Sequence, residues 1–312
     1  MSATRRARVR ALAKINLDLR VLARRPDGFH ELRTIFQTIT LADTIEIAFT
    51  AARKTSIELA DDLGLPDNLV TRAARLVMDA TGATGRVAMR LSKRIPMGAG
   101  LGGGSSDAAA VLLALPVLVR ERLPLEKLAQ LGQELGSDVP FFLLGGAAVG
   151  IGRGAELFPL PDRRTQQGVL VSPDIHVSTP EAYRRLSPCL TTESQENKIF
   201  SFQSQAWGVG VPEAAANDFE TVVFGLHEEI AAIKKSLIRA GASTALMTGS
   251  GSSVFGLFGD SGKAARAVRS FGEGKAFRFS LVSRARYRSL WWRALGELIT
   301  EKTWPPQSRN IG

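Results

Sequence analysis

Apolar and polar positions alternate along much of the first third of the chain, most clearly in residues 11–22, 35–49 and 87–95. A period of two residues predicts strands that bury one face. Pro26-Asp27-Gly28 follows the first stretch, and this triplet is typical of a turn. The pattern therefore predicts a sheet near the N-terminus.

Apolar residues recur at helical spacing elsewhere, for example at Leu69, Ala73, Leu76 and Val77. This spacing places them on one face of a helix. Helices are predicted over residues 68–80, 106–118, 125–135 and 214–240. The third is expected to end at Gly136, because glycine is favoured just after a helix C-terminus.

The second half continues with predicted strands around glycines in residues 245–258, followed by another helix and strand. Strands and helices mix without the regular alternation of a doubly wound sheet, which predicts an α+β fold with two lobes. Pro159, Pro161 and Asp162 cluster where one lobe would end. We expect an N-terminal lobe over 1–160, a C-terminal lobe over 161–283 and a basic tail over 284–312. Residues 187–211 are polar without a clear pattern and are predicted to form a loop.

The composition, with 45% hydrophobic and 22% charged residues, is that of a globular protein. A single cysteine, Cys189, excludes an intramolecular disulfide framework and a cysteine-rich metal site. The longest apolar run, residues 108–119, is too short to span a bilayer. No apolar run follows the N-terminal arginines, so we expect no secretory signal, no membrane partner and a cytoplasmic location.

The formal net charge of +10 suits an anionic partner, but it is concentrated at the two ends. The first ten residues hold four arginines and no acidic residue, and residues 284–312 hold six basic and two acidic residues. The body between them has no basic stripe interleaved with aromatic residues. We therefore expect no nucleic-acid partner. The tryptophans of the tail, Trp291, Trp292 and Trp304, allow an amphipathic contact, although a helix packed on the body is the favoured interpretation.

Residues 96–107 read PMGAGLGGGSSD and precede the strongly apolar helix. Glycines let the backbone approach a ligand closely, and the first N–H groups of a helix have no partners within it. Together they predict a phosphate site. The residues expected to bind ATP at this site are Pro96, Gly98, Gly100, Gly102, Gly103, Gly104, Ser105 and Ser106. The serine hydroxyls are also candidate oxygen contacts for Mg²⁺.

The same segment has other interpretations. It could be a flexible turn followed by an ordinary helix cap at Ser106 or Asp107. A Walker A loop requires Gly-Lys-Ser/Thr, whereas Gly104 is followed by Ser105. The spacing of Gly98, Gly100 and Gly103 matches a dinucleotide motif, but no clean strand with a ribose-binding acid follows.

The loop resembles the ATP loop of the GHMP kinases, which include galactokinase, homoserine kinase and mevalonate kinase. Four further blocks resemble the 4-diphosphocytidyl-2-C-methyl-D-erythritol kinase family in its own order: AKINL at 13–17, RPDGFHEL at 25–32, GSDVPFF at 136–142 and TGSGSSVF at 248–255. The resemblance covers roughly residues 10 to 260. It implies transfer of the γ-phosphate of ATP, with Mg²⁺, to the 2-hydroxyl of 4-diphosphocytidyl-2-C-methyl-D-erythritol. It also implies that ATP and substrate meet in a cleft between the lobes.

The resemblance assigns catalysis to Lys14 and Asp138. Asp138 would accept the proton of the attacking hydroxyl, and a lysine beside it would keep the carboxylate ionised. Read alone, Asp138 is a turn former. Lys14 stands isolated within an apolar strand, and Asn16, two residues on, shares its face. Asn16 could bind substrate or satisfy a backbone group.

The resemblance also assigns binding residues. Those expected at the adenine and ribose are Asn68 and Lys93, and a surface or capping role is the alternative for each. Those expected at the substrate are Asn16, Phe29, His30, Phe36, Thr179, Tyr183, Gly249, Ser250 and Gly251. Phe29, His30 and Tyr183 would stack on and read the cytosine, with Phe29 standing where the family usually has tyrosine. The N–H groups around Ser250 would form a nest for the diphosphate. No metal-ligand carboxylate is evident, so Mg²⁺ is expected to be held mainly by phosphates and water.

Three alternatives remain open at this point. A different GHMP kinase, of the homoserine or mevalonate type, would keep the chemistry and change the acceptor. A basic RNA-associated protein would leave Lys14, the glycine loop and Asp138 unexplained. A non-catalytic nucleotide-binding relative would not need Lys14 and Asp138 together. The sequence leaves the choice between monomer and homodimer open.

Overall fold

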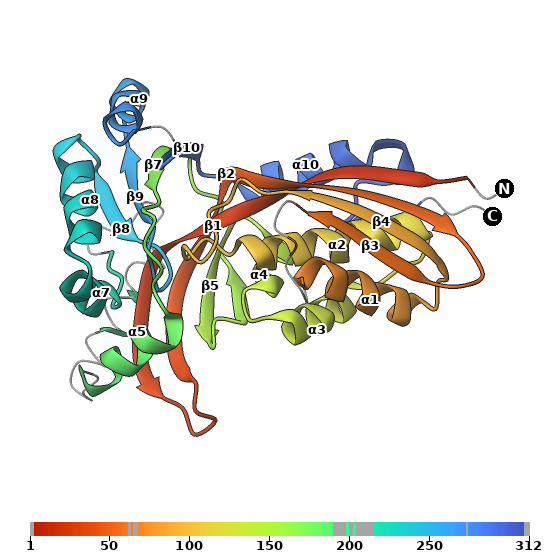
Figure 1. The fold of residues 1–312 in the computed structure, drawn as a ribbon, viewed down its shortest axis with the longest axis horizontal. Coiled ribbons are helices and arrows are strands. Elements are labelled where there is room, and N and C mark those ends of the chain that lie inside the picture. The colour runs from red at the N-terminus through yellow and green to blue at the C-terminus, as the bar shows by residue number, and fades with distance from the viewer. Residues whose placement is uncertain are drawn as a thin grey trace.

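The computed structural model describes residues 3–61, 64, 68–189, 198–199, 202–203, 215–272 and 274–308. The first lobe is built on a sheet with strands in the order β3-β4-β2-β5-β6, and β1 pairs with β2 beside this path (Figure 1). Its strands are β1 (Arg5–Arg24), β2 (His30–Ala51), β3 (Ser56–Asp61), β4 (Gly85–Ser92), β5 (Ala147–Gly152) and β6 (Glu156–Pro159). All pairs are antiparallel except β3 with β4.

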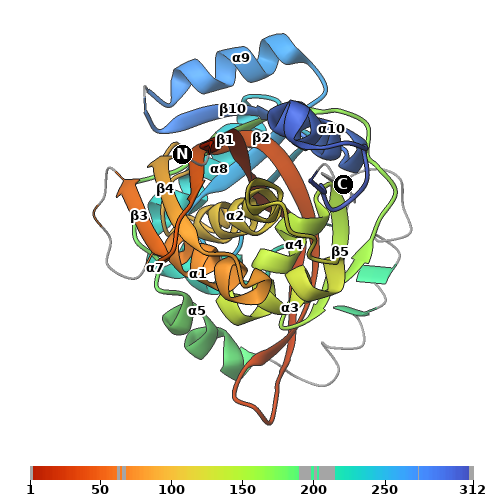
Figure 2. The same ribbon diagram turned by 90° about the vertical axis from the view of Figure 1, so that its right-hand side faces the viewer.

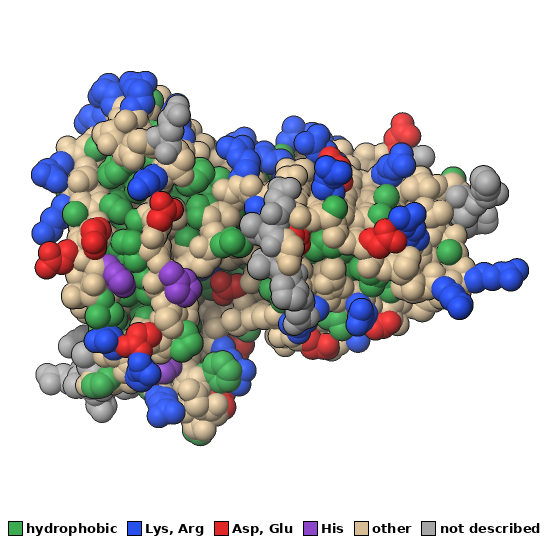
Figure 3. All heavy atoms as spheres, viewed as in Figure 1, with side chains coloured by type: hydrophobic (Ala, Val, Ile, Leu, Met, Phe, Trp, Pro, Cys, Tyr) green, Lys and Arg blue, Asp and Glu red, His purple; other side chains and the backbone are tan. Residues whose placement is uncertain are grey.

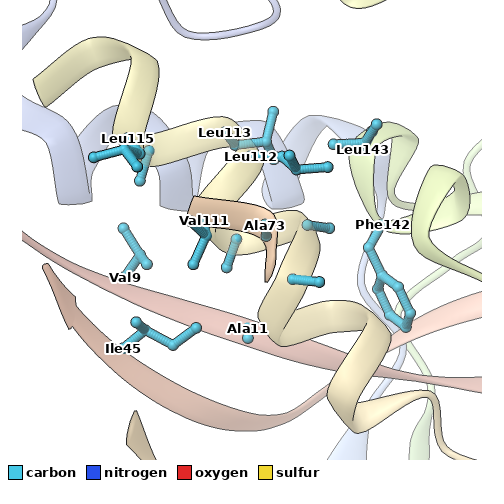
Figure 4. Close-up of a cluster of buried hydrophobic side chains, with 14 of the residues drawn as sticks. Val9, Ala11, Ile45, Ala73, Val111, Leu112, Leu113, Leu115, Phe142 and Leu143 are labelled. Carbon is cyan, nitrogen blue, oxygen red and sulfur yellow. The ribbon is translucent and has the colours of Figure 1, made fainter. Parts of the chain in front are cut away.

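Helices pack on this sheet, and the central one is α2 (Gly103–Val119). Its neighbours are α1 (Leu69–Thr81), α3 (Leu125–Leu135) and α4 (Val139–Leu144) (Figure 2). From Ser106 to Val119 every residue of α2 is buried, which a helix tolerates only when other elements surround it. Figure 4 shows Val111 of α2 facing Val9 of β1 and Ile45 of β2 in the main core. This packing fixes the N-terminus of α2, where the glycine loop ends.

The second lobe contains an antiparallel sheet in the order β10-β7-β9-β8. Its strands are β7 (Gln167–Val171), β8 (Thr244–Met247), β9 (Val254–Phe258) and β10 (Ala276–Ser280). Its helices are α5 (Thr179–Leu186), α7 (Glu220–Leu226), α8 (Glu228–Arg239) and α9 (Ser261–Ser270), with a 3₁₀ turn η1 (Ser187–Cys189) after α5. The connection between β6 and β7 carries the chain from the first sheet to the second.

After β10 the chain returns to the first lobe as α10 (Arg284–Leu295), followed by the 3₁₀ turn η2 (Gly296–Leu298). Tyr287 and Trp291 are buried, and the Tyr287 hydroxyl donates to the Phe142 carbonyl at 2.5 Å. The favoured interpretation of the tail, a helix packed on the body, is confirmed for α10. Among the described residues, no helix has the length and apolar character needed to cross a membrane.

The α+β class and the predicted strands and helices of the first half are confirmed, and α3 is followed by Gly136 as expected. Two details differ. Strand β3 was not predicted, because its polar, exposed alternate positions give a weak signal. Helix α2 begins at Gly103 with Gly102 as its cap, so a cap at Ser106 or Asp107 is wrong. Most of the loop predicted at 187–211 lies outside the described residues, and the lobe boundary at 160 stays a prediction.

Candidate active site

The glycine loop between β4 and α2 has a backbone that only glycine adopts easily. Gly98, Gly100 and Gly102 have φ values of 63°, 76° and 67°. A Cβ on Gly100 would lie 2.0 Å from the Thr248 carbonyl oxygen, and a Cβ on Gly102 would lie 2.8 Å from the Phe142 ring. The loop therefore packs against both lobes and opens directly into α2. No side chain caps this helix, so its first N–H groups are available to an anion.

A pocket of about 500 Å³ lies over this loop. Asn68, Leu69, Leu91 and Lys93 line it together with the loop. Asn68 also caps α1 by accepting the Val70 N–H at 3.0 Å, and its contact with a nucleotide stays a prediction. The pocket combines apolar walls with an anion site at one end, as a nucleotide requires.

Lys93 does not project freely into this pocket. Its ammonium donates to Asp43 at 2.5 Å and to Asp107 at 2.8 Å. Asp107, expected to be a cap, is instead buried within α2 beside the pocket. Burial and the nearby Asp43 raise the pKa of Asp107 to about 7, although the Lys93 charge acts in the opposite direction.

Lys14 and Asp138 meet at the junction of the lobes. Lys14 lies on β1 with only 4% of its surface exposed, and its Nζ is 3.6 Å from Asp138 Oδ2. Asp138 occupies the turn between α3 and α4, so it is both the turn former and the partner of the lysine. Burial lowers the pKa of Lys14, and the Asp138 carboxylate partly offsets this effect. The Lys14 N–H donates to the Leu101 carbonyl at 3.0 Å, which ties the pair to the glycine loop.

Asn16 connects this pair to the second lobe. Its Oδ1 accepts from Lys14 Nζ at 2.8 Å, from the Gly249 N–H at 2.9 Å and from the Thr248 hydroxyl at 3.2 Å. Its Nδ2 donates to the Thr34 hydroxyl at 2.7 Å. Asn16 therefore satisfies a backbone group and orients Lys14, while also lining the cleft described next.

A larger cleft of about 1440 Å³ adjoins the first pocket and lies between the lobes. Figure 3 shows the surface hollowed there. Gly98, Gly100, Gly102 and Ser105 line both spaces, so the glycine loop is their shared wall. Lys14 and Asp138 line the cleft, so an ammonium and a carboxylate face it beside the glycine loop.

Aromatic side chains gather at the far part of this cleft. The His30 and Tyr183 rings stack with centroids 4.6 Å apart and planes at 22°, and His30 Nε2 is 2.8 Å from the Ser187 hydroxyl. Burial, followed by the charge of Arg24, lowers the pKa of His30. Phe29 is 53% exposed, and the guanidinium of Arg153 lies 3.8 Å from its ring centroid. Such surfaces suit a flat, neutral ring.

Comparison with known proteins decides the family. Residues 68–146 match the GHMP kinases N terminal domain, and residues 203–274 match the GHMP kinases C terminal domain. A 4-diphosphocytidyl-2-C-methyl-D-erythritol kinase from Solibacter usitatus (strain Ellin6076) is 67% identical over 313 residues, covering 99% of both chains. One from Pelotomaculum thermopropionicum is 43% identical over 256 residues, covering 80% of this chain and 88% of the relative.

The chain belongs to the 4-diphosphocytidyl-2-C-methyl-D-erythritol kinase family. A crystal structure of 4-(cytidine 5'-diphospho)-2C-methyl-D-erythritol kinase superposes with a TM-score of 0.75 at 37% identity, covering 88% of this chain and 98% of that one. A homoserine kinase from Cytophaga hutchinsonii superposes with a TM-score of 0.66 at 17% identity, covering 89% and 95%. The second likeness shows only the shared fold. The chain is thus a kinase of the GHMP type, and the homoserine, mevalonate and RNA alternatives are not favoured.

In this 4-diphosphocytidyl-2-C-methyl-D-erythritol kinase family member, the residues predicted for the substrate fall largely in one place. Those that line the cleft are Lys14, Asn16, Phe29, His30, Phe36, Asp138, Thr179, Tyr183, Gly249 and Ser250. Phe36 packs on Phe141 at 4.9 Å between centroids, below Lys14. The Thr179 and Ser250 hydroxyls bond to each other at 2.7 Å.

Two predictions about the kinase site need correction. The turn at 249–251 is not a nest of free N–H groups, because Gly249 donates to Asn16 and Gly251 donates to the Thr248 carbonyl. Gly251 is also outside the lining of the cleft. Ser106 is buried and donates to the Leu12 carbonyl at 2.7 Å, which leaves Ser105 as the serine that faces both spaces.

Sequence reasoning missed several residues of the site. Arg153 and His176 line the cleft, and Asp43 and Asp107 hold Lys93 beside the pocket over the glycine loop. Arg153 directly follows Gly152, the last residue of β5, and His176 stands alone in a short coil, so neither belongs to a periodic pattern. Asp107 was visible inside the glycine motif, but a capping role explained it without reference to Lys93.

Proposed function

We propose that this chain transfers the γ-phosphate of ATP to the 2-hydroxyl of 4-diphosphocytidyl-2-C-methyl-D-erythritol, giving ADP and the 2-phosphate, a step of non-mevalonate isoprenoid biosynthesis. The observation that carries the proposal is the Lys14–Asp138 pair, 3.6 Å apart at the junction of the nucleotide pocket and the cleft. The name of the Solibacter relative, 67% identical over the full length, supports the acceptor.

In the proposed reaction Asp138 accepts the proton of the 2-hydroxyl as its oxygen forms a bond to the γ-phosphorus and the bond to ADP breaks. Phosphoryl transfer depends mainly on positioning and charge stabilisation. Lys14 supplies a positive charge beside the attacking oxygen and keeps Asp138 oriented. Asn16 holds Lys14 through the 2.8 Å hydrogen bond, so the ammonium has a defined position before substrate arrives.

The glycine loop and the N-terminus of α2 are proposed to bind the phosphates of ATP. Mg²⁺, when bound, would neutralise charge on the transferring phosphates. Phosphates and water are proposed to supply most of the ion's oxygen contacts. Within the described ranges, no cluster of three or more His, Cys, Asp or Glu side chains is placed for a metal. Ser105 supplies a hydroxyl oxygen where the two spaces meet.

The acceptor is proposed to place its cytosine against the aromatic group of the cleft. His30 and Tyr183 present stacked rings, and Phe29 presents an exposed ring beside Arg153. Stacking does not require a hydroxyl, so phenylalanine at position 29 preserves this role. Thr179 and Ser250 would face the part of the acceptor between its base and the reacting hydroxyl.

The test measures ADP release from ATP and Mg²⁺ with 4-diphosphocytidyl-2-C-methyl-D-erythritol for wild type, Asp138→Asn and Glu46→Gln. Glu46 is an exposed carboxylate that pairs with Arg8 and serves as the matched control. We expect substrate-dependent turnover in wild type and Glu46→Gln, and a loss of about 10²- to 10⁴-fold in Asp138→Asn.

Turnover that survives in Asp138→Asn would remove Asp138 as the base and leave the kinase assignment standing. A wild-type protein that binds ATP but phosphorylates only homoserine or mevalonate from a panel of alcohols would overturn the proposed acceptor.

A further inference from the structure

A groove lies between β1 and the returning helix α10, apart from the candidate active site. It encloses about 290 Å³ and is lined by Arg8, Val9, Arg10, Thr44, Leu290, Trp291 and Ala294. None of these residues lines the pocket over the glycine loop or the cleft between the lobes. Figure 2 shows α10 beside β1 and β2. The groove is therefore a separate cavity, and the proposed phosphoryl transfer gives it no role.

The two walls of this groove differ in chemistry. Val9 is 1% exposed and faces the core, so its neighbours Arg8 and Arg10 leave β1 on the opposite, exposed face. On α10, Leu290 and Ala294 stand four residues apart and share one face of the helix. One wall is thus basic and the other apolar, which suits a ligand with an anionic group on an apolar body.

Three guanidinium groups gather at one end of the groove. Arg286 stands four residues before Leu290, on the same face of α10. Arg94 follows the end of β4, which pairs with β2. Burial, followed by the charges of Arg94 and Arg286, lowers the pKa of Arg10, as expected where like charges lie close together. Positive charges held together in this way favour a bound anion.

These three arginines have no acidic partner. Among the residues that the structure describes, none of the three forms an ion pair, whereas Arg8 pairs with Glu46 at 3.5 Å. Arg10 Nη2 donates to the Thr40 carbonyl at 2.9 Å, which directs the guanidinium and leaves its other N–H groups for a ligand. A phosphate accepts several donors in the planar arrangement that arginine presents. A phosphate therefore fits at the Arg10 end, and Glu46 repels it from the Arg8 end.

We propose that this groove binds a small organic phosphate, with its phosphate at Arg10, Arg94 and Arg286 and its apolar body along Leu290 and Trp291. The volume of about 290 Å³ is close to the lower end of small-molecule sites, about 300 Å³, so the occupant is a small molecule rather than a polymer. The inference does not depend on the proposed kinase reaction, because no residue of the groove takes part in that reaction.

The experiment follows the indole N–H of Trp291 by NMR in protein made with ¹⁵N-labelled tryptophan. The chain holds four tryptophans, and Trp291→Phe assigns the signal. The probe is phenyl phosphate, with phenol as the body without the phosphate and inorganic phosphate as the phosphate without the body. We expect phenyl phosphate to shift the signal to saturation, and phenol and inorganic phosphate each to bind about tenfold or more weakly.

Variants place the binding at the arginines. Arg286→Gln removes an exposed guanidinium that makes no ion pair in the described part of the chain, so its loss should leave the fold intact. Arg286→Gln and Arg10→Gln should each weaken phenyl phosphate binding by about tenfold or more. Arg269→Gln, on α9 of the second lobe, is the matched control: it removes the same charge from an exposed helical arginine and should leave the affinity unchanged. Thermal melts check that all three variants fold.

The proposal would be overturned if phenyl phosphate left the Trp291 signal in place, if Arg286→Gln bound it as tightly as wild type, or if Arg269→Gln weakened binding equally. Equal binding of phenol would show an apolar pocket without phosphate recognition, and equal binding of inorganic phosphate would show an adventitious ion only. Either result would also overturn the proposal. An RNA oligonucleotide that displaced phenyl phosphate at a lower concentration would assign the arginines to nucleic acid instead.

Discussion

Replacing Asn16 with alanine tests how the two lobes hold the catalytic lysine. The substitution removes the acceptor of Lys14 Nζ and of the Gly249 N–H, both in a site that is 2% exposed. A buried N–H without a partner costs about 1–3 kcal/mol, and a hydrogen bond to a charged group contributes about 1.5–3 kcal/mol. The Thr248 hydroxyl still donates to the Gly100 carbonyl at 3.2 Å, so the loss of its bond to Asn16 adds little to the change in stability. The free energy of unfolding should fall by about 3–5 kcal/mol.

Urea unfolding followed by tryptophan fluorescence measures this change, and steady-state kinetics measure its effect on the reaction. Because Asn16 orients Lys14, kcat should fall about tenfold or more with a smaller change in KM for ATP. Thr34→Val is the matched control: it removes only the hydroxyl that accepts from Asn16 Nδ2 and donates to the Asp18 carbonyl. Thr34→Val should lower the free energy of unfolding by about 1–2 kcal/mol and leave kcat nearly unchanged. The reasoning would be refuted if the free energy of unfolding of Asn16→Ala lay within about 1 kcal/mol of wild type, or if the substitution changed only KM.

Two further predictions concern the nucleotide pocket. Gly100→Ala should weaken ATP binding more than tenfold, because its Cβ would lie 2.0 Å from the Thr248 carbonyl oxygen. Gly98→Ala should weaken ATP binding less in the same titration, because the atom nearest to its Cβ is in His176 at 3.5 Å. The free energy of unfolding should fall as the pH rises from about 4 to about 7, because burial raises the pKa of Asp107 to about 7 while the same carboxyl in the unfolded chain loses its proton near pH 4. Lys93 and Asp43 face the same carboxyl, and urea unfolding of wild type and Asp107→Asn at pH 5 and pH 8 reports the effect. A decrease of equal size in both proteins would contradict it.

The fold class and most elements could be predicted from the sequence because their signals are local. Alternation in residues 87–95 corresponds to β4, and helical spacing in 68–80 corresponds to α1. Strand β3 was missed because it pairs in parallel with β4 at the sheet edge and buries little. Its identity as a strand depends on that partner, which no local pattern reveals.

In the candidate site, too, the residues in local motifs could be predicted, and the roles that depend on distant contacts could not. Lys14 and Asp138 could be named from motifs, and their ion pair confirms that they meet. The roles of Asp43 and Asp107 could not be named, because they depend on a lysine 50 and 14 residues away. The nest expected at 249–251 was wrong for the same kind of reason: Asn16, distant in sequence, takes the Gly249 N–H.

The long strand β1 explains why the two spaces meet at Lys14. Its register with β2 shifts between Leu12 and Lys14 and again between Asn16 and Asp18, and residues 14–16 pair with β2 between these two irregularities. There the Lys14 N–H donates to the Leu101 carbonyl of the glycine loop, and the Asn16 N–H donates to the Thr248 hydroxyl of the second lobe at 3.1 Å. One short stretch of backbone thus contacts both the phosphate loop and the opposite lobe. Since the Lys14 and Asn16 side chains leave from the same stretch, the position of the ammonium depends on both lobes at once.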